Sequence, residues 1–160
     1  MYKKLLPFFL IATSIAQATP QEDLLNAVVA GNIAQAQQAL EQGASINTLV
    51  TGSYEPNLPK ERSLLLMAVR NADSAMVNFL LSHPTVDITK QQVDACLALI
   101  IVILADLQGF TFGGMMHYWD RYTYLPTDKD KEIAEEQLHA IQRLLLEKQK
   151  LIKTPILPLQ

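Results

Sequence analysis

Three histidines are the residues of this chain best suited to acid–base or metal chemistry, and they are widely spaced. His117 lies shortly before Asp120, so this carboxylate is near enough in sequence to orient the imidazole as a general base. His83 lies in a proline-containing turn, and His139 lies among charged residues. A two-histidine metal site would require His117 and His139 to meet in space, which nothing in their spacing establishes.

No catalytic motif accompanies these histidines in the sequence. It contains no Gly-x-Ser-x-Gly, no His-Glu-x-x-His and no Gly-rich phosphate loop. The charged run 128–132 lacks the glycine and the ligand spacing of a calcium loop, so it indicates the start of a helix. We therefore expect a protein that is not an enzyme and that uses no cofactor and no metal. A hydrolase built around His117 is the alternative.

The first 18 residues have the pattern of a secretory signal peptide. Lys3 and Lys4 precede an apolar segment, residues 5–16, and Ala16-Gln17-Ala18 supplies the small residues of a cleavage site. The apolar segment is shorter than the roughly 20 residues that a membrane span needs. We expect cleavage after Ala18 and a mature chain, residues 19–160, in the periplasm or outside the cell, without stable membrane insertion.

The charge of the chain limits the kinds of partner, and its cysteine content limits the covalent cross-links. Removing Lys3 and Lys4 from the 13 basic residues leaves 11 against 16 acidic ones, a formal net charge of −5. This balance, with no basic run, argues against nucleic acid and anionic membranes as partners. Cys96 is the only cysteine and lies in an apolar stretch, so we expect a buried, unreactive thiol and no internal disulfide.

Two segments repeat one pattern of helix, hinge, helix and turn. The first covers residues 22–47 and closes with Gly43-Ala44-Ser45-Ile46-Asn47. The second covers residues 63–88, and its Ala68 lies 41 residues after the equivalent Ala27. A helix pair of this size cannot bury its apolar face alone, so such pairs stack on their neighbours.

These segments resemble ankyrin repeats. Glu22-Asp23-Leu24-Leu25-Asn26-Ala27 stands where that family has Thr-Pro-Leu-His-x-Ala, and the closing motif of the first segment is similar to Gly-Ala-Asp-Val-Asn. The second segment departs further, because Ala72 replaces the hinge glycine and Leu64 the proline. The step of 41 residues exceeds the roughly 33 of an ankyrin repeat, and the surplus, residues 48–62, predicts an enlarged finger loop.

A third, irregular unit is expected over residues 91–150. Residues 91–107 predict a helix that is buried on most sides. Residues 141–148 resemble the outer-helix motif of the family, in a helix that Thr127 or Asp128 caps. Its apolar stripe consists of Ala134, Leu138, Ile141, Leu145 and Ile152. The predicted fold is an all-α ankyrin-repeat solenoid of about three helix pairs.

The resemblance implies protein–protein binding through the finger loops and the inner helices. Between the helices of the third unit lies an insertion, residues 108–126, that combines six aromatic residues with Arg121, the composition of binding hot spots. A cap on the open end of the stack is the equal alternative for this insertion. The expected partner-binding residues are Tyr54, Tyr118, Trp119, Arg121 and Tyr122.

Small exported bacterial ankyrin proteins include immunity proteins, so the resemblance implies a specific role. We expect a periplasmic inhibitor or immunity protein that masks a partner, such as a toxin or another enzyme. The alternative is a secreted factor that docks on a foreign or host protein.

Overall fold

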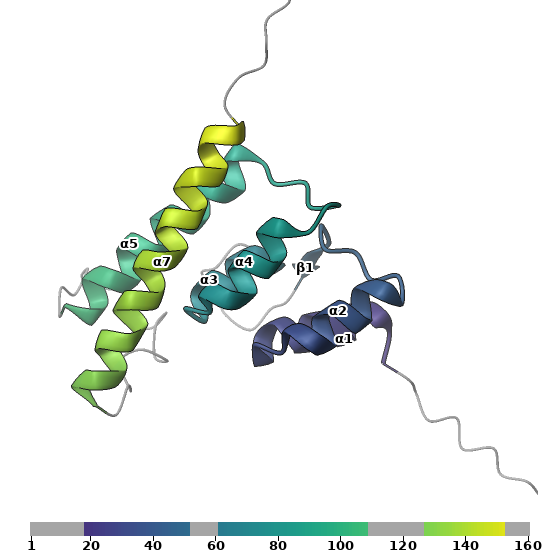
Figure 1. Cartoon of the computed structure of the whole chain (residues 1–160), viewed down its shortest axis with the longest axis horizontal. Helices are drawn as coiled ribbons and strands as arrows, with labels where there is room; N and C mark the ends of the chain where they lie inside the picture. The colour runs from purple at the N-terminus through teal and green to yellow at the C-terminus, as the bar shows by residue number, and fades with distance from the viewer. Residues whose placement is uncertain (1–17, 52–60, 109–126, 153–160) are drawn as a thin grey trace, which may run out of the picture.

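The computed structural model of this chain describes residues 18–51, 61–108 and 127–152. These residues form six helices and one short pair of antiparallel strands. The helices lie as three pairs in chain order (Figure 1). The pairs are α1 (Pro20–Ala30) with α2 (Ile33–Glu41), α3 (Leu64–Arg70) with α4 (Ser74–Ser82), and α5 (Lys90–Leu107) with α7 (Asp128–Ile152). The predicted all-α class is confirmed at this level.

The first two pairs turn with the same backbone hydrogen bonds. The carbonyl of Ala27 accepts from the N–H of Asn32 at 2.9 Å, and the carbonyl of Ala68 accepts from the N–H of Asp73 at 3.2 Å. Asn32 and Asp73 then cap α2 and α4 through their side-chain oxygens. Both capped helices contain nine residues. The step of 41 residues that separates the two sequence repeats therefore also separates two hinges with the same hydrogen bonds and the same kind of cap.

Helix α3 is the centre of the stack, because it contacts α1, α4 and α5. Leu64, Ala68 and Val69 on this helix are at most 1% exposed. The predicted stripe of α7 is also buried at four of its positions, which are Ala134, Leu138, Ile141 and Leu145, while Ile152 is partly buried. In the part of the chain that the structure describes, every buried residue is apolar. Packing is the main source of stability here.

A strand pair that the sequence analysis did not predict joins the first two helix pairs. Strands β1 (Leu49–Thr51) and β2 (Glu61–Ser63) run antiparallel, with Val50 opposite Arg62. The expected finger loop of residues 48–62 thus begins and ends in a hairpin stem. Ser63 closes this stem and also caps α3, since its hydroxyl accepts from the N–H of Leu66.

The third pair is much longer than the first two. Helix α5 has 18 residues and α7 has 25, against seven and nine in α3 and α4. The two long helices lie side by side and antiparallel (Figure 1). Thr127 caps α7, because its hydroxyl accepts from the N–H of Asp130 at 3.2 Å. None of the helices described is both long and apolar enough to cross a membrane.

Replacing Ala72 with glycine should stabilise the fold by about 1 kcal/mol, because an alanine in the left-handed region costs 1–2 kcal/mol. Ala72 has φ 51°, the only positive φ of a non-glycine residue in the described ranges. Urea unfolding of Ala72→Gly would measure the gain. The matched control is Gly31→Ala at the equivalent hinge, where φ is 69° and a Cβ would lie 2.6 Å from an oxygen of Asp73. The Gly31→Ala variant should be less stable than the wild type. Equal changes in the free energy of unfolding from the two substitutions would contradict the shared hinge geometry.

Candidate functional site

The partner-binding residues predicted from the sequence lie outside the described residues. These are Tyr54, Tyr118, Trp119, Arg121 and Tyr122, and the same holds for His117 and Asp120. The structure does place the ends of the two segments that carry them. Residues 52–60 join the strands of the hairpin stem, and residues 109–126 join α5 to α7.

The two histidines within the described ranges, His83 and His139, lie on different elements. His83 follows α4, and its Nδ1 lies 2.9 Å from the hydroxyl of Thr85. His139 lies on α7, with Nε2 3.8 Å from the carboxylate of Glu135 on the same exposed face. Among the described residues, the polar partners of both histidines are near neighbours in sequence. No cluster of three or more metal-ligating side chains occurs among the residues described.

Cys96 is buried in the core, as predicted. Its exposed fraction is 0%, and burial raises the pKa of the thiol to about 12. A thiol with this pKa is almost entirely protonated at neutral pH, and the thiolate is the nucleophilic form. The side chain therefore acts as a small apolar group that packs α5.

A groove of about 430 Å³ lies between α4 and α7. Small side chains, Ala75 and Asn78 on one wall and Ala140 on the other, leave this space. Arg143 and Glu147 add one charge of each sign from α7. The described walls of the groove carry no histidine and no cysteine.

Polar contacts connect the two walls at both ends of this groove. The hydroxyl of Ser74 hydrogen-bonds to Oε1 of Gln137 near the start of α4. The ammonium of Lys148 donates to the carbonyl of Leu81 at 3.3 Å near the end of α4. These two contacts show that α4 and α7 run in the same direction. They also hold the two walls of the groove in register.

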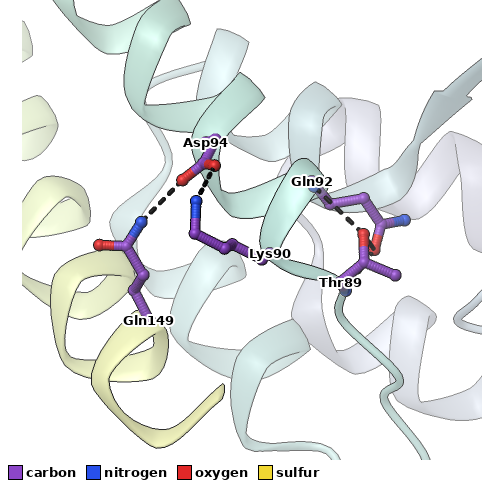
Figure 2. Close-up of polar contacts among 5 residues, drawn as sticks. All are labelled: Thr89, Lys90, Gln92, Asp94 and Gln149. Atoms are coloured by element: carbon purple, nitrogen blue, oxygen red, sulfur yellow. Dashed lines mark hydrogen bonds and ion pairs between the residues drawn. The ribbon is translucent and has the colours of Figure 1, made fainter. Parts of the chain in front are cut away.

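Helix α5 begins with a capping box and is tied to α7 just beyond it (Figure 2). The backbone N–H of Thr89 donates to Gln92 at 2.9 Å, and the N–H of Gln92 donates to the hydroxyl of Thr89 at 3.2 Å. One turn on, Asp94 accepts from Lys90 at 2.5 Å and from Gln149 of α7 at 2.7 Å. The hydrogen bond from Lys90 is the main reason that the pKa of Asp94 lies below its ordinary value.

Two polar side chains connect successive turns of the stack, and the sequence analysis did not single them out. Gln21 on α1 donates to the carbonyl of Ser45 at 3.2 Å and accepts from its N–H at 2.9 Å. Asn47 donates to the carbonyl of Thr85 at 2.8 Å and accepts from the N–H of Asp87 at 2.9 Å. Asn47 could have been identified from the sequence, because it is the last residue of the closing motif Gly43–Asn47.

We expect the capping box of α1 to lose stability in acid, whereas the box of α5 should not. Hydrogen bonds from the backbone and the hydroxyl of Thr19 lower the pKa of Glu22 below 4.5. A carboxylate with a lowered folded pKa contributes stability above its unfolded pKa and loses it as the pH falls through the folded value. Glu22→Ala should therefore destabilise the chain at pH 7 more than at pH 3, as measured by urea unfolding at both pH values.

Gln92→Ala supplies the matched control, because Gln92 holds the same N3 position in the α5 box and does not titrate. Gln92→Ala should lower the free energy of unfolding by the same amount at pH 7 and at pH 3. A Glu22→Ala effect that is also independent of pH would contradict the assigned role of the carboxylate.

Comparison with known proteins gives no further guide to the site: no family model, curated protein or solved structure matches this chain. The arguments below therefore start from the residue pattern of residues 22–88 and from the geometry given above.

Proposed function

We propose that residues 19–160 form a short ankyrin-like stack that binds another protein and inhibits it after export. The observation that carries this proposal is the agreement of two independent features. The sequence pattern repeats at a step of 41 residues, and the hinge hydrogen bonds and helix caps repeat at the same step. Stacked helix pairs of this kind are built to present an extended surface to a protein partner.

Binding rather than catalysis is favoured by what surrounds the ionisable groups in the described ranges. Cys96 is buried and protonated, His83 and His139 lie at the surface and on different elements, and the described walls of the groove between α4 and α7 carry one charge of each sign. We propose Tyr54, Tyr118, Trp119, Arg121 and Tyr122 as the partner contacts. A partner enzyme with a cleft would be masked by the segments that carry these residues.

Capture of a partner from native periplasm tests this function. We expect mature wild-type chain to retain one enzyme and to lower the activity of that enzyme when the two are mixed. The double variant Trp119→Ala, Tyr122→Ala should retain at least about tenfold less, since truncating hot-spot residues costs about 2 kcal/mol or more.

The matched control is Gln37→Ala, Leu151→Ala, which removes two exposed side chains from α2 and α7; Leu151 is 80% exposed. The control variant should retain the same amount of partner as the wild type. Equal capture by the wild type, the double variant and the control variant would mean that the interface lies outside residues 109–126. A captured protein whose activity is unchanged would favour the docking alternative over inhibition.

Export is the second part of the proposal, and the start of α1 supports it. Helix α1 begins at Pro20 and is capped by Thr19, the first residue after the proposed cleavage site. The capping box uses the N–H and hydroxyl of Thr19 and the carboxylate of Glu22, so it needs no residue before position 19. Cleavage after Ala18 would therefore leave the first helix with its complete cap.

Expression of the full chain in a Gram-negative host should yield a periplasmic product whose first residue is Thr19. Signal peptidase requires small residues at the two positions of Ala16 and Ala18. Intact-mass measurement of the periplasmic fraction would identify the terminus. Ala16→Lys, Ala18→Lys should leave the uncleaved precursor with the membrane fraction. A wild-type chain that keeps Met1 and stays in the cytoplasm would refute export.

A further inference from the structure

The stack of helix pairs has two ends, and they differ in polarity. Figure 1 shows the three pairs in a row, so the first and the third pair each have one side that no other described helix covers. At the first end, the exposed side chains that line the hollow between α1 and α2 are polar, namely Asp23, Asn26, Gln35, Gln38 and Gln42. A terminal unit of a repeat array needs such a polar outer face, because nothing stacks on it.

The outer side of α5, at the other end of the stack, is apolar. All residues from position 95 to 105 are apolar, whichever side of the helix they occupy. A helix that is apolar all round is normally buried all round. Helices α3 and α7 cover α5 on two sides, but Ala95, Ala98 and Ile101 are exposed in the single chain, Ile101 at 59%. This end therefore lacks the polar face that the first end has.

The hydrogen bond between Asp94 and Gln149 fixes the level of α5 against α7 (Figure 2). Because the two helices are antiparallel, seven residues on along α5 and seven residues back along α7 reach the same level. The residues at that level are Ile101 and Gln142. Leu146 is 41% exposed and lies four residues from Gln142 and three from Gln149, on the same side of α7. Ile101 and Leu146 therefore form the apolar centre of an outer face that α5 and α7 share.

Charged groups of opposite sign lie at the two ends of this outer face. Glu135 stands seven residues before Gln142 on α7, and its side chain is 40% exposed. Lys150 stands eight residues after Gln142 and is also exposed. A second copy that met this face antiparallel, with Gln142 at the level of its counterpart, would bring Glu135 of each copy close to the level of Lys150 of the other. The face is thus complementary to itself in charge.

We propose that the outer face of α5 and α7 is a homodimer interface, on which a second copy of this chain packs antiparallel about a twofold axis near Ile101 and Gln142. A twofold contact brings the same patch of both copies together, so the apolar centre of one copy covers that of the other. Ala98 and Ala105 lie about one turn to either side of Ile101 and are small, so the two α5 helices can approach closely. The oppositely charged ends of α7 then pair at the edges and set the direction of association. This dimer does not depend on the proposed function, because it uses a different surface from the proposed partner contacts.

Sedimentation equilibrium of the mature chain, residues 19–160, over a series of concentrations tests this interface. The wild type should reach twice the mass of one chain. Ile101→Glu places two carboxylates against each other near the axis, so the dissociation constant of the dimer should rise by at least about a hundredfold. Ile133→Glu is the matched control, because Ile133 is 47% exposed and lies two residues before Glu135, on a different side of α7. The control variant should dimerise as tightly as the wild type.

Two results of this experiment would overturn the proposal. The first is a wild type that stays monomeric at every concentration, as expected if residues 109–126 or a different protein cover the outer face instead. The second is a wild-type dimer that Ile101→Glu leaves intact, because the contact would then lie on another surface.

Exchanging the charges of α7 tests the antiparallel arrangement and leaves the apolar centre unchanged, so it also serves if Ile101→Glu does not fold. Glu135→Lys alone and Lys150→Glu alone should each raise the dissociation constant by roughly tenfold, since each turns two attractive pairs at the edge into two repulsive ones. The double variant Glu135→Lys, Lys150→Glu should return to a dissociation constant near that of the wild type. Equal dissociation constants for all four chains, or a double variant weaker than both single variants, would overturn the assigned arrangement.

Discussion

The burial of the seven-residue helix α3 is the constraint on which the rest of the structure depends. A helix of seven residues is too short to be stable alone, because nucleation is unfavourable and few hydrogen bonds form. Its apolar residues are buried against three other helices, α1, α4 and α5. Neither neighbouring pair can cover its own apolar face without this central layer. The described elements are therefore expected to fold as one unit rather than as three independent pairs.

Polar contacts then set the relative positions of the turns, which apolar packing alone leaves undetermined. Hydrophobic burial has no direction, whereas hydrogen bonds do. Gln21 and Asn47 each bind both the donor and the acceptor of a turn in the next part of the chain. A side chain caps the N-terminus of each helix described, from Thr19 of α1 to Thr127 of α7. These groups lie at the surface, so they position the turns without adding buried polarity to the core.

The two segments that carry the proposed partner contacts both start from packed elements. The hairpin stem of β1 and β2 is the base of residues 52–60, which include the proposed contact Tyr54. The long third pair, α5 and α7, is in turn the base of residues 109–126. Both proposed contact segments thus begin and end on elements that the core holds in place.

The sequence by itself determined the helices, because helical spacing and capping residues act locally. It predicted the hinges at Gly31 and Ala72, a cap of α7 at Thr127 or Asp128, the buried stripe of α7 and the buried Cys96. It did not predict the strand pair, the groove between α4 and α7 or the orphaned donors of Arg62. Each of these depends on residues distant in the chain meeting at a particular distance. Only tertiary packing sets that distance, since three-residue strands carry too little periodicity to read and the burial of an arginine is decided by its neighbours in space.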